Sequence, residues 1–182
     1  MQNNKNKLNT TSKKSWLLYA IALAVVIAVV VIVICLFNAN KKVTKYSQLT
    51  SLETSEIYEA SAKNKDYYYV LFYDSSETQD SDVQDKVLEY ASLVSKKGSN
   101  AYSYRIYLLD VNDYANNHIV YSGDGVTTSI KDAASFDDIV VKDSDLAILV
   151  KFNNDHTVSK VFKTNEKIIA ELDDGIASIK AA

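Results

Sequence analysis

Five acidic side chains lie within 12 consecutive residues near the middle of the chain. Carboxylate oxygens in such number can bind a hard cation such as Ca²⁺. Their spacing lacks the Asp-x-Asp-x-Asp-Gly pattern of a calcium loop, and acids that follow Ser81 also suit the positively polarised start of a helix. We therefore favour a solvated helix start over a metal site. The five acids are Asp74, Glu77, Asp80, Asp82 and Asp85.

Other residue types that carry chemistry are scarce. Glu77 and Asp80 can act as an acid/base pair only if a closed cleft raises the pKa of one of them, which spacing does not show. His118 and His156 are far apart in the sequence, and Cys35 has no second cysteine to pair with. We assign no catalytic residue, no metal site and no cofactor, and we do not expect an enzyme.

The sequence contains no convincing phosphate-binding or serine-hydrolase motif. Gly123-Asp124-Gly125 has no third glycine or lysine to make a phosphate-binding loop, so it predicts a turn. No G-x-S-x-G motif indicates a serine hydrolase.

Composition narrows the class of protein further. The 182 residues are 47% hydrophobic, with no proline and 4 glycines, which excludes collagen-like and mucin-like chains. Residues 38–182 carry 16 Lys or Arg against 23 Asp or Glu, a net charge of −7. Such an acidic domain is repelled by anionic lipid heads and by nucleic acid, so we expect no nucleic-acid partner.

The segment from Leu17 to Phe37 contains no charged residue over 21 positions. A helix of that length spans about 31 Å, which matches the hydrocarbon core of a bilayer. We expect a cytoplasmic tail over residues 1–15, a transmembrane helix over 16–37, a linker over 38–45 and one folded domain over 46–182. The membrane is thus the first expected partner.

Two alternatives to a transmembrane helix fit less well. A cleaved signal peptide has a shorter apolar region that ends in small residues, and a lipidated cysteine needs a small residue where Ile34 precedes Cys35. Lysines flank the apolar segment on both sides, four before and three after. With the N-terminal amine this slight excess predicts a cytoplasmic N-terminus and a domain outside the cell membrane.

The domain should begin with a β-α-β unit. Residues 67–73 (YYYVLFY) form an apolar and aromatic run typical of a central strand. Ser81 and Gln84 have the spacing of a capping box, and apolar residues then recur at helical intervals up to Gly98. Residues 104–111 predict a second strand, parallel to the first because a helix separates them.

The remaining elements complete an α/β fold. We expect short helices over residues 54–63 and 114–120, the latter followed by an irregular loop, and a hairpin of strands 146–152 and 157–162. A closing helix is marked by apolar residues at Ile168, Ile169, Leu172, Ile176 and Ile179. The order is β-α-β, insertion, β-β-α, with a mixed central sheet, and most tyrosines should belong to the core or the sheet faces.

This order resembles the thioredoxin-like family over residues 46–180. Three segments carry the resemblance: a strand that leads through a polar loop into a helix (YYYVLFYDSSETQDSDVQDKVLEYA), a strand that ends in acid (YLLDVND) and a hairpin with a polar turn (LAILVKFNNDHTVSKVF). The resemblance implies a thioredoxin-like fold, an extracytoplasmic setting and a surface beside the helix start that holds an extended segment of a partner.

The chain departs from that family at its redox site. The Cys-x-x-Cys motif is replaced by Glu77, Thr78, Gln79 and Asp80, and carboxylates cannot exchange thiols. The family's cis-proline position is taken by Ser144, Asp145 and Leu146. Because a non-proline cis bond costs about 2.5–4 kcal/mol, we expect a trans peptide there.

The resulting hypothesis is a membrane-tethered, redox-inactive thioredoxin-like domain that binds a protein or peptide, or serves as a partner subunit. One alternative is an accessory protein of an export or thiol-disulfide exchange system that depends on a cysteine-bearing partner. Another is a hydrolase or metal enzyme that uses the acidic loop. The expected binding surface combines the loop over 74–80 with residues 144–146, near the insertion over 121–138: Asp74, Ser75, Ser76, Ser144, Asp145 and Leu146.

Overall fold

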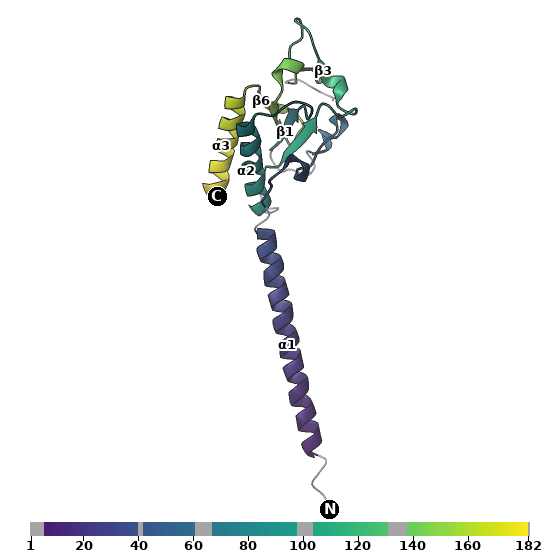
Figure 1. Ribbon diagram of the computed structural model, residues 1–182, viewed down its shortest axis with the longest axis vertical. Helices are drawn as coiled ribbons and strands as arrows, with labels where there is room; N and C mark the ends of the chain where they lie inside the picture. Colours follow the sequence, from purple (N-terminus) through teal and green to yellow (C-terminus); the bar gives the residue numbers. More distant parts are fainter. Residues whose placement is uncertain (1–5, 40–41, 61–66, 98–103, 131–137, 182) are drawn as a thin grey trace, which may run out of the picture. The chain divides into compact units, whose positions relative to one another are not determined.

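The computed structural model describes all residues except 1–5, 40–41, 61–66, 98–103, 131–137 and 182. The chain divides into two compact units, Met1–Lys41 and Lys42–Ala182 (Figure 1). Each unit is described separately below.

The first unit contains one long helix, α1, over Asn6–Ala39. Its segment Trp16–Leu36 is long and apolar enough to cross a membrane, and none of that segment is buried against protein. An apolar surface of this extent is what a helix presents to lipid. The expected N-terminal apolar helix is therefore present, while its orientation stays a prediction.

The second unit is built on a mixed four-stranded sheet with the strand order β2-β1-β5-β6. β1 pairs with β2 in parallel and with β5 in antiparallel register, so it is a central strand, as its apolar sequence predicts. β5 and β6 form the expected antiparallel hairpin. The strands are β1 (Tyr67–Tyr73), β2 (Ile106–Asp110), β5 (Ile148–Asn153) and β6 (Val158–Phe162).

Two α-helices lie side by side on one face of this sheet (Figure 1). α2 (Ser81–Lys97) connects the parallel strands β1 and β2, and α3 (Asn165–Ala181) follows β6. Their apolar faces pack on the sheet residues Tyr69, Leu71 and Leu149. The mixed α/β class and the order β-α-β, insertion, β-β-α are thus confirmed.

The opposite face of the sheet is covered by irregular segments. Buried side chains from 52–60 and 119–141 pack there on Tyr68, Val70 and Phe72. The short helices expected over 54–63 and 114–120 are only 3₁₀ turns, η2 (Thr54–Glu56) and η4 (Asn117–Ile119), and residues 61–63 lie outside the described part. A short segment that places one apolar residue on the sheet can do so with a single 3₁₀ turn, because a longer helix would bury no further apolar surface that stabilises it.

The same region contains a few further short elements. Two-residue strands β3 (Val120–Tyr121) and β4 (Val141–Lys142) pair in parallel as a separate small sheet. The 3₁₀ turn η1 (Tyr46–Gln48) precedes Ser51, which forms an isolated bridge with Leu108 of β2. The 3₁₀ turn η6 (Asp143–Asp145) precedes β5.

A buried asparagine fastens these irregular segments to the sheet. The Asn116 side-chain oxygen accepts hydrogen bonds from the backbone N–H (2.7 Å) and hydroxyl (2.9 Å) of Thr54. Its Nδ2 donates to the carbonyls of Asp110 (2.9 Å) and Leu52 (3.3 Å). All four bonding positions of the amide are used, which offsets the desolvation of a polar group that is 1% exposed.

A second polar cluster lies where α3 meets the sheet. The Tyr69 hydroxyl donates to Glu171 Oε1 at 2.7 Å, and Lys151 Nζ lies 3.1 Å from the same oxygen. The ammonium group of Lys151 also lies 3.9 Å from the centre of the Tyr67 ring. Burial raises the pKa of Glu171, but the bonds from Tyr69 and Lys151 outweigh it, so that the pKa lies below its ordinary value.

The lowered pKa of Glu171 predicts a loss of stability in acid. The ionised carboxylate contributes its full stabilisation above the unfolded pKa of about 4.3. This contribution should be lost as pH falls from there through the lower folded pKa. In urea titrations of the full chain in detergent, Glu171→Gln should be less stable than the wild type at pH 7, and this difference should shrink by pH 3. Glu166→Gln, at an exposed position of the same helix, is the control, and an equal difference at both pH values would contradict the prediction.

The helix pair also depends on one close approach. A Cβ added at Gly175 would lie 2.8 Å from Cε2 of Tyr90, whose ring is fully buried and whose hydroxyl donates to the Tyr104 carbonyl. Gly→Ala normally stabilises a helix, but here the ring cannot move aside. We expect Gly175→Ala to lower the free energy of unfolding by about 1–3 kcal/mol. Exposed Ser178→Ala should change it by less than about 0.5 kcal/mol, and a stabilised Gly175→Ala protein would refute the packing argument.

Candidate functional site

A small pocket of about 160 Å³ lies at the N-terminal end of α2. The loop between β1 and α2 forms one wall, and the segment just before β5 forms the other. Because β1 and α2 meet at this end of the sheet and β5 starts there, the fold brings the two distant segments together. The lining residues are Asp74, Glu77, Thr78, Gln79, Asp80, Val83, Leu146, Ala147 and Asn165.

Asp80 closes the start of α2. Its Oδ1 accepts hydrogen bonds from the backbone N–H groups of Asp82 (3.0 Å) and Val83 (3.1 Å), and its carbonyl accepts from Gln84 (3.0 Å). Asp80 is therefore the N-cap, and the predicted Ser81–Gln84 capping box is wrong. The prediction placed the cap one residue late, since both residue types favour this position and only the path of the chain decides between them.

The loop before the cap is held by its own hydrogen bonds. The Asp74 carboxylate accepts from the backbone N–H (2.7 Å) and hydroxyl (2.6 Å) of Ser76. Gln79 Nε2 donates to the Asp74 carbonyl at 2.6 Å, and the Ser75 N–H donates to Asp110 Oδ1 at 3.1 Å. These local bonds order the loop and leave the Glu77 side chain exposed at the pocket wall.

The segment facing this loop differs from expectation. The peptide bond between Leu146 and Ala147 is cis, so the predicted trans peptide at this position is wrong. The expectation used the intrinsic cost of a non-proline cis bond, but tertiary packing sets the path here. Leu146 packs against the core, its N–H donates to the Asp143 carbonyl, and Ile148 is buried.

Only part of the predicted binding surface comes together. The loop residues Asp74 and 77–80 share the pocket with Leu146, as expected. Ser75, Ser76, Ser144 and Asp145 are not among the residues that line it.

The Asp145 side chain makes contacts within the folded unit. Its carboxylate accepts a hydrogen bond of 2.6 Å from the Thr128 hydroxyl and lies 3.7 Å from Lys163 Nζ. Thr128 belongs to the insertion, and its hydroxyl also accepts from the Lys142 N–H at 2.9 Å. Asp145 thus ties the described part of the insertion beside the hairpin, while residues 131–137 lie outside the described part.

Three lining residues were not identified from the sequence. Val83 belongs to the periodic apolar face of α2, so the sequence indicates a core residue at this position and not a site residue. Ala147 and Asn165 have no distinctive sequence context. Asn165 Nδ2 donates to Asp80 Oδ2 at 3.0 Å, a contact over 85 positions that only the packing of α3 beside α2 creates.

The arrangement offers little for metal or acid/base chemistry. Among the residues that the structure describes, no group of three or more His, Cys, Asp or Glu is arranged to hold a metal ion. Glu77 and Asp80 are both exposed, so no closed cleft surrounds them. His118 follows the end of β2 and His156 follows the end of β5, which are opposite ends of the sheet. Gly123 and Val126 form the expected turn.

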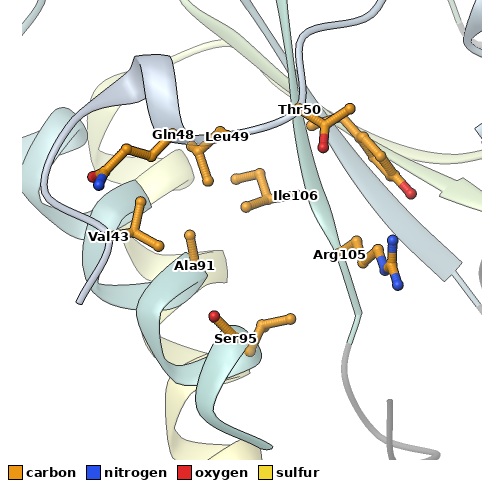
Figure 2. A pocket seen from close by; sticks show the side chains of 10 residues that line it. Val43, Gln48, Leu49, Thr50, Ala91, Ser95, Arg105 and Ile106 are labelled. Atoms are coloured by element: carbon orange, nitrogen blue, oxygen red, sulfur yellow. The ribbon is translucent and has the colours of Figure 1, made fainter. Parts of the chain in front are cut away.

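A larger hollow of about 390 Å³ lies elsewhere, between the first segment of the second unit, α2 and β2 (Figure 2). Its walls combine the apolar side chains of Val43, Leu49, Ala91, Val94 and Ile106 with polar ones from Gln48, Thr50, Ser95 and Arg105. Figure 2 shows Val43, Ala91, Leu49 and Ile106 around one open space, with Arg105 at its edge. No local pattern in the sequence predicts this hollow, because its walls come from three separate segments.

Comparison with known proteins identifies no relative: no family model, no curated protein and no solved structure matches the chain. The function must therefore be argued from the two sites themselves.

The capping assignment predicts a sharp contrast between two neighbouring residues. Asp80→Ala removes the acceptor for two backbone N–H groups and should lower the free energy of unfolding by about 1 kcal/mol. Ser81→Ala removes no hydrogen bond at the helix start and should have little effect. Urea unfolding monitored by circular dichroism measures both. The reverse order of the two losses would restore Ser81 as the cap.

Proposed function

We propose that the protein is a membrane-tethered, redox-inactive, thioredoxin-like module that binds an extended segment of a protein partner outside the cell membrane. The observation that carries the proposal is the shared pocket of the 74–80 loop and Leu146–Ala147 at the start of α2. The resemblance to the thioredoxin-like family implies a partner-binding surface at this place.

Several features of the fold support the resemblance. The elements follow one another in the order that it implies, and β1 lies centrally with β2 parallel to it. The pocket lies where the first strand meets its helix, which is where the family keeps its reactive motif.

The chemistry of the pocket supports binding over thiol exchange. In a thiol site, the N–H groups at the helix start stabilise a thiolate and lower its pKa. Here two of those N–H groups already bond to the Asp80 carboxylate. The position is thus occupied by a stable cap, and the one cysteine of the chain, Cys35, lies in the apolar helix.

The pocket walls also indicate the kind of segment that fits. Leu146, Ala147 and Val83 supply apolar surface, and the carboxylates of Asp74 and Glu77 lie beside them. An acidic rim favours a partner segment with Lys or Arg next to a small apolar residue. The tether would raise the local concentration of the module near partners at the membrane.

The alternative is an accessory role in export or thiol-disulfide exchange, in which a cysteine-bearing partner supplies the chemistry. It uses the same pocket and differs only in the partner. An insulin-reduction assay bears on both proposals, because turnover by the chain alone would contradict the redox-inactive assignment.

Site-specific photo-crosslinking in intact cells tests the binding surface. A photoreactive residue at position 77 should give a discrete crosslinked product. Leu146→Asp should abolish this product, because it replaces an apolar side chain of the pocket wall with a charged one. The same probe at exposed Ala170, on α3, is the control. Equal products from positions 77 and 170, or a product unaffected by Leu146→Asp, would argue against this pocket.

A further inference from the structure

The surface at which the chain enters the second unit combines exposed cations with two hollows whose walls are partly apolar. Lys42 and Lys96 line a groove of about 540 Å³, together with Lys180 and the half-buried Leu88 and Leu93. The hollow of Figure 2 lies on the other side of Val43, which lines both. Its edge carries Arg105, the one arginine of the chain.

This surface is built on a fixed framework. The Val43 N–H donates to the Ser92 hydroxyl at 2.9 Å, and that hydroxyl donates back to the Val43 carbonyl at 3.1 Å. Ser92 is 6% exposed and Val43 is half-buried, so both bonds are partly shielded from water. The first residues of the unit are therefore fastened along α2, and Lys42 is held near Lys96.

The covalent connection limits how far this surface can lie from a bilayer. Lys42 lies six positions after Leu36, the end of the apolar segment. A fully extended chain spans at most about 3.5 Å per residue, or about 21 Å in all. Whatever the arrangement of the two units, Lys42 stays close to the membrane surface if α1 spans it.

Acidic and basic side chains are distributed unevenly along α2, which affects how a nearby membrane surface interacts with the domain. Acids gather at the start of α2, whereas Lys96 lies at its other end. A helix of 17 residues is about 25 Å long, and charges in 0.1 M salt are screened over about 10 Å. A nearby surface therefore senses the cations of the near end more than the net charge of −7.

The acids of this surface do not cancel its cations. Glu89 lies 3.2 Å from Lys86 and 3.4 Å from Lys180, so these groups compensate one another. Asp85 remains as the other acid of the groove. Lys42, Lys96 and Arg105 form no ion pair with any residue that the structure describes.

We propose that this surface, formed by Lys42, Lys96 and Arg105 around the two hollows beside Val43, binds the anionic phospholipids of the adjoining bilayer. Phosphate groups pair with the cations, and the apolar side chains among the mixed walls, such as Leu88, Leu93 and Leu49, accept the adjacent glycerol and upper acyl carbons. The proposal rests on the membrane tether but not on the peptide pocket.

A fluorescence experiment on the full chain tests this binding. With Cys35→Ser and Ser95→Cys, an environment-sensitive NBD probe is attached beside Lys96, and the protein is placed in nanodiscs. Emission should be stronger with phosphatidylglycerol present than with phosphatidylcholine alone, and high salt should abolish the increase. Each cation near the surface contributes roughly fivefold, so Lys42→Gln with Lys96→Gln should reduce the ratio of bound to free domain on the order of 20-fold.

The controls make each result decisive. Lys160→Gln with Lys167→Gln removes two exposed charges from β6 and the start of α3, and the lipid response should persist. Equal emission in both lipids, a response that survives Lys42→Gln with Lys96→Gln or high salt, or an equal response to inorganic phosphate in phosphatidylcholine discs would overturn the proposal. A chain that fails to enter nanodiscs would overturn the tether. The crosslinking at position 77 reports separately on the peptide pocket.

Discussion

The second unit depends on the burial of β1. Its five inner residues, 68–72, are each at most 1% exposed, because the strand is paired on both edges and covered on both faces. A strand of this kind requires a layer on each side of the sheet. The parallel α2 and α3 supply one layer, and irregular segments supply the other. The pocket at the start of α2 lies where the loop from β1 to that helix meets the segment that leads into β5.

The two layers reach the sheet by different physical means. The helices pack through periodic apolar faces and a close approach at Gly175, and the periodic faces can be predicted from the local sequence. The irregular layer uses single anchors such as Ile57, Ile119 and Ile139, with Asn116 linking the segments through four hydrogen bonds. Such a layer leaves almost no periodic trace in the sequence, since each anchor belongs to a different turn.

This contrast explains what the sequence could and could not predict. The run YYYVLFY predicted β1 at its observed bounds, and the other three main strands lie within two residues of prediction, because apolar runs between polar clusters depend on local composition. The 3₁₀ turns, the role of Asn116 and the cap at Asp80 depend on contacts between distant segments. At the site, the order of elements predicts that Leu146 lies beside the 74–80 loop, and both line the same pocket. The hydrogen bond from the Thr128 hydroxyl to Asp145 could not be predicted, because it depends on the path of the insertion.

The peptide pocket lies at the N-terminal end of α2, whereas the groove of the second surface runs along the helix from Asp85 to Lys96. The N-terminal end of α2 is capped by a carboxylate, and its C-terminal half carries Lys96, so each end bears the charge that stabilises a helix. The same charges make one end unattractive to anionic lipid and the other attractive to it. A lipid phosphate paired with Lys96 would lie about 24 Å from Asp80, because the two residues are 16 positions apart along the helix. The charge pattern that stabilises α2 would thereby also set which end of the domain a partner can reach.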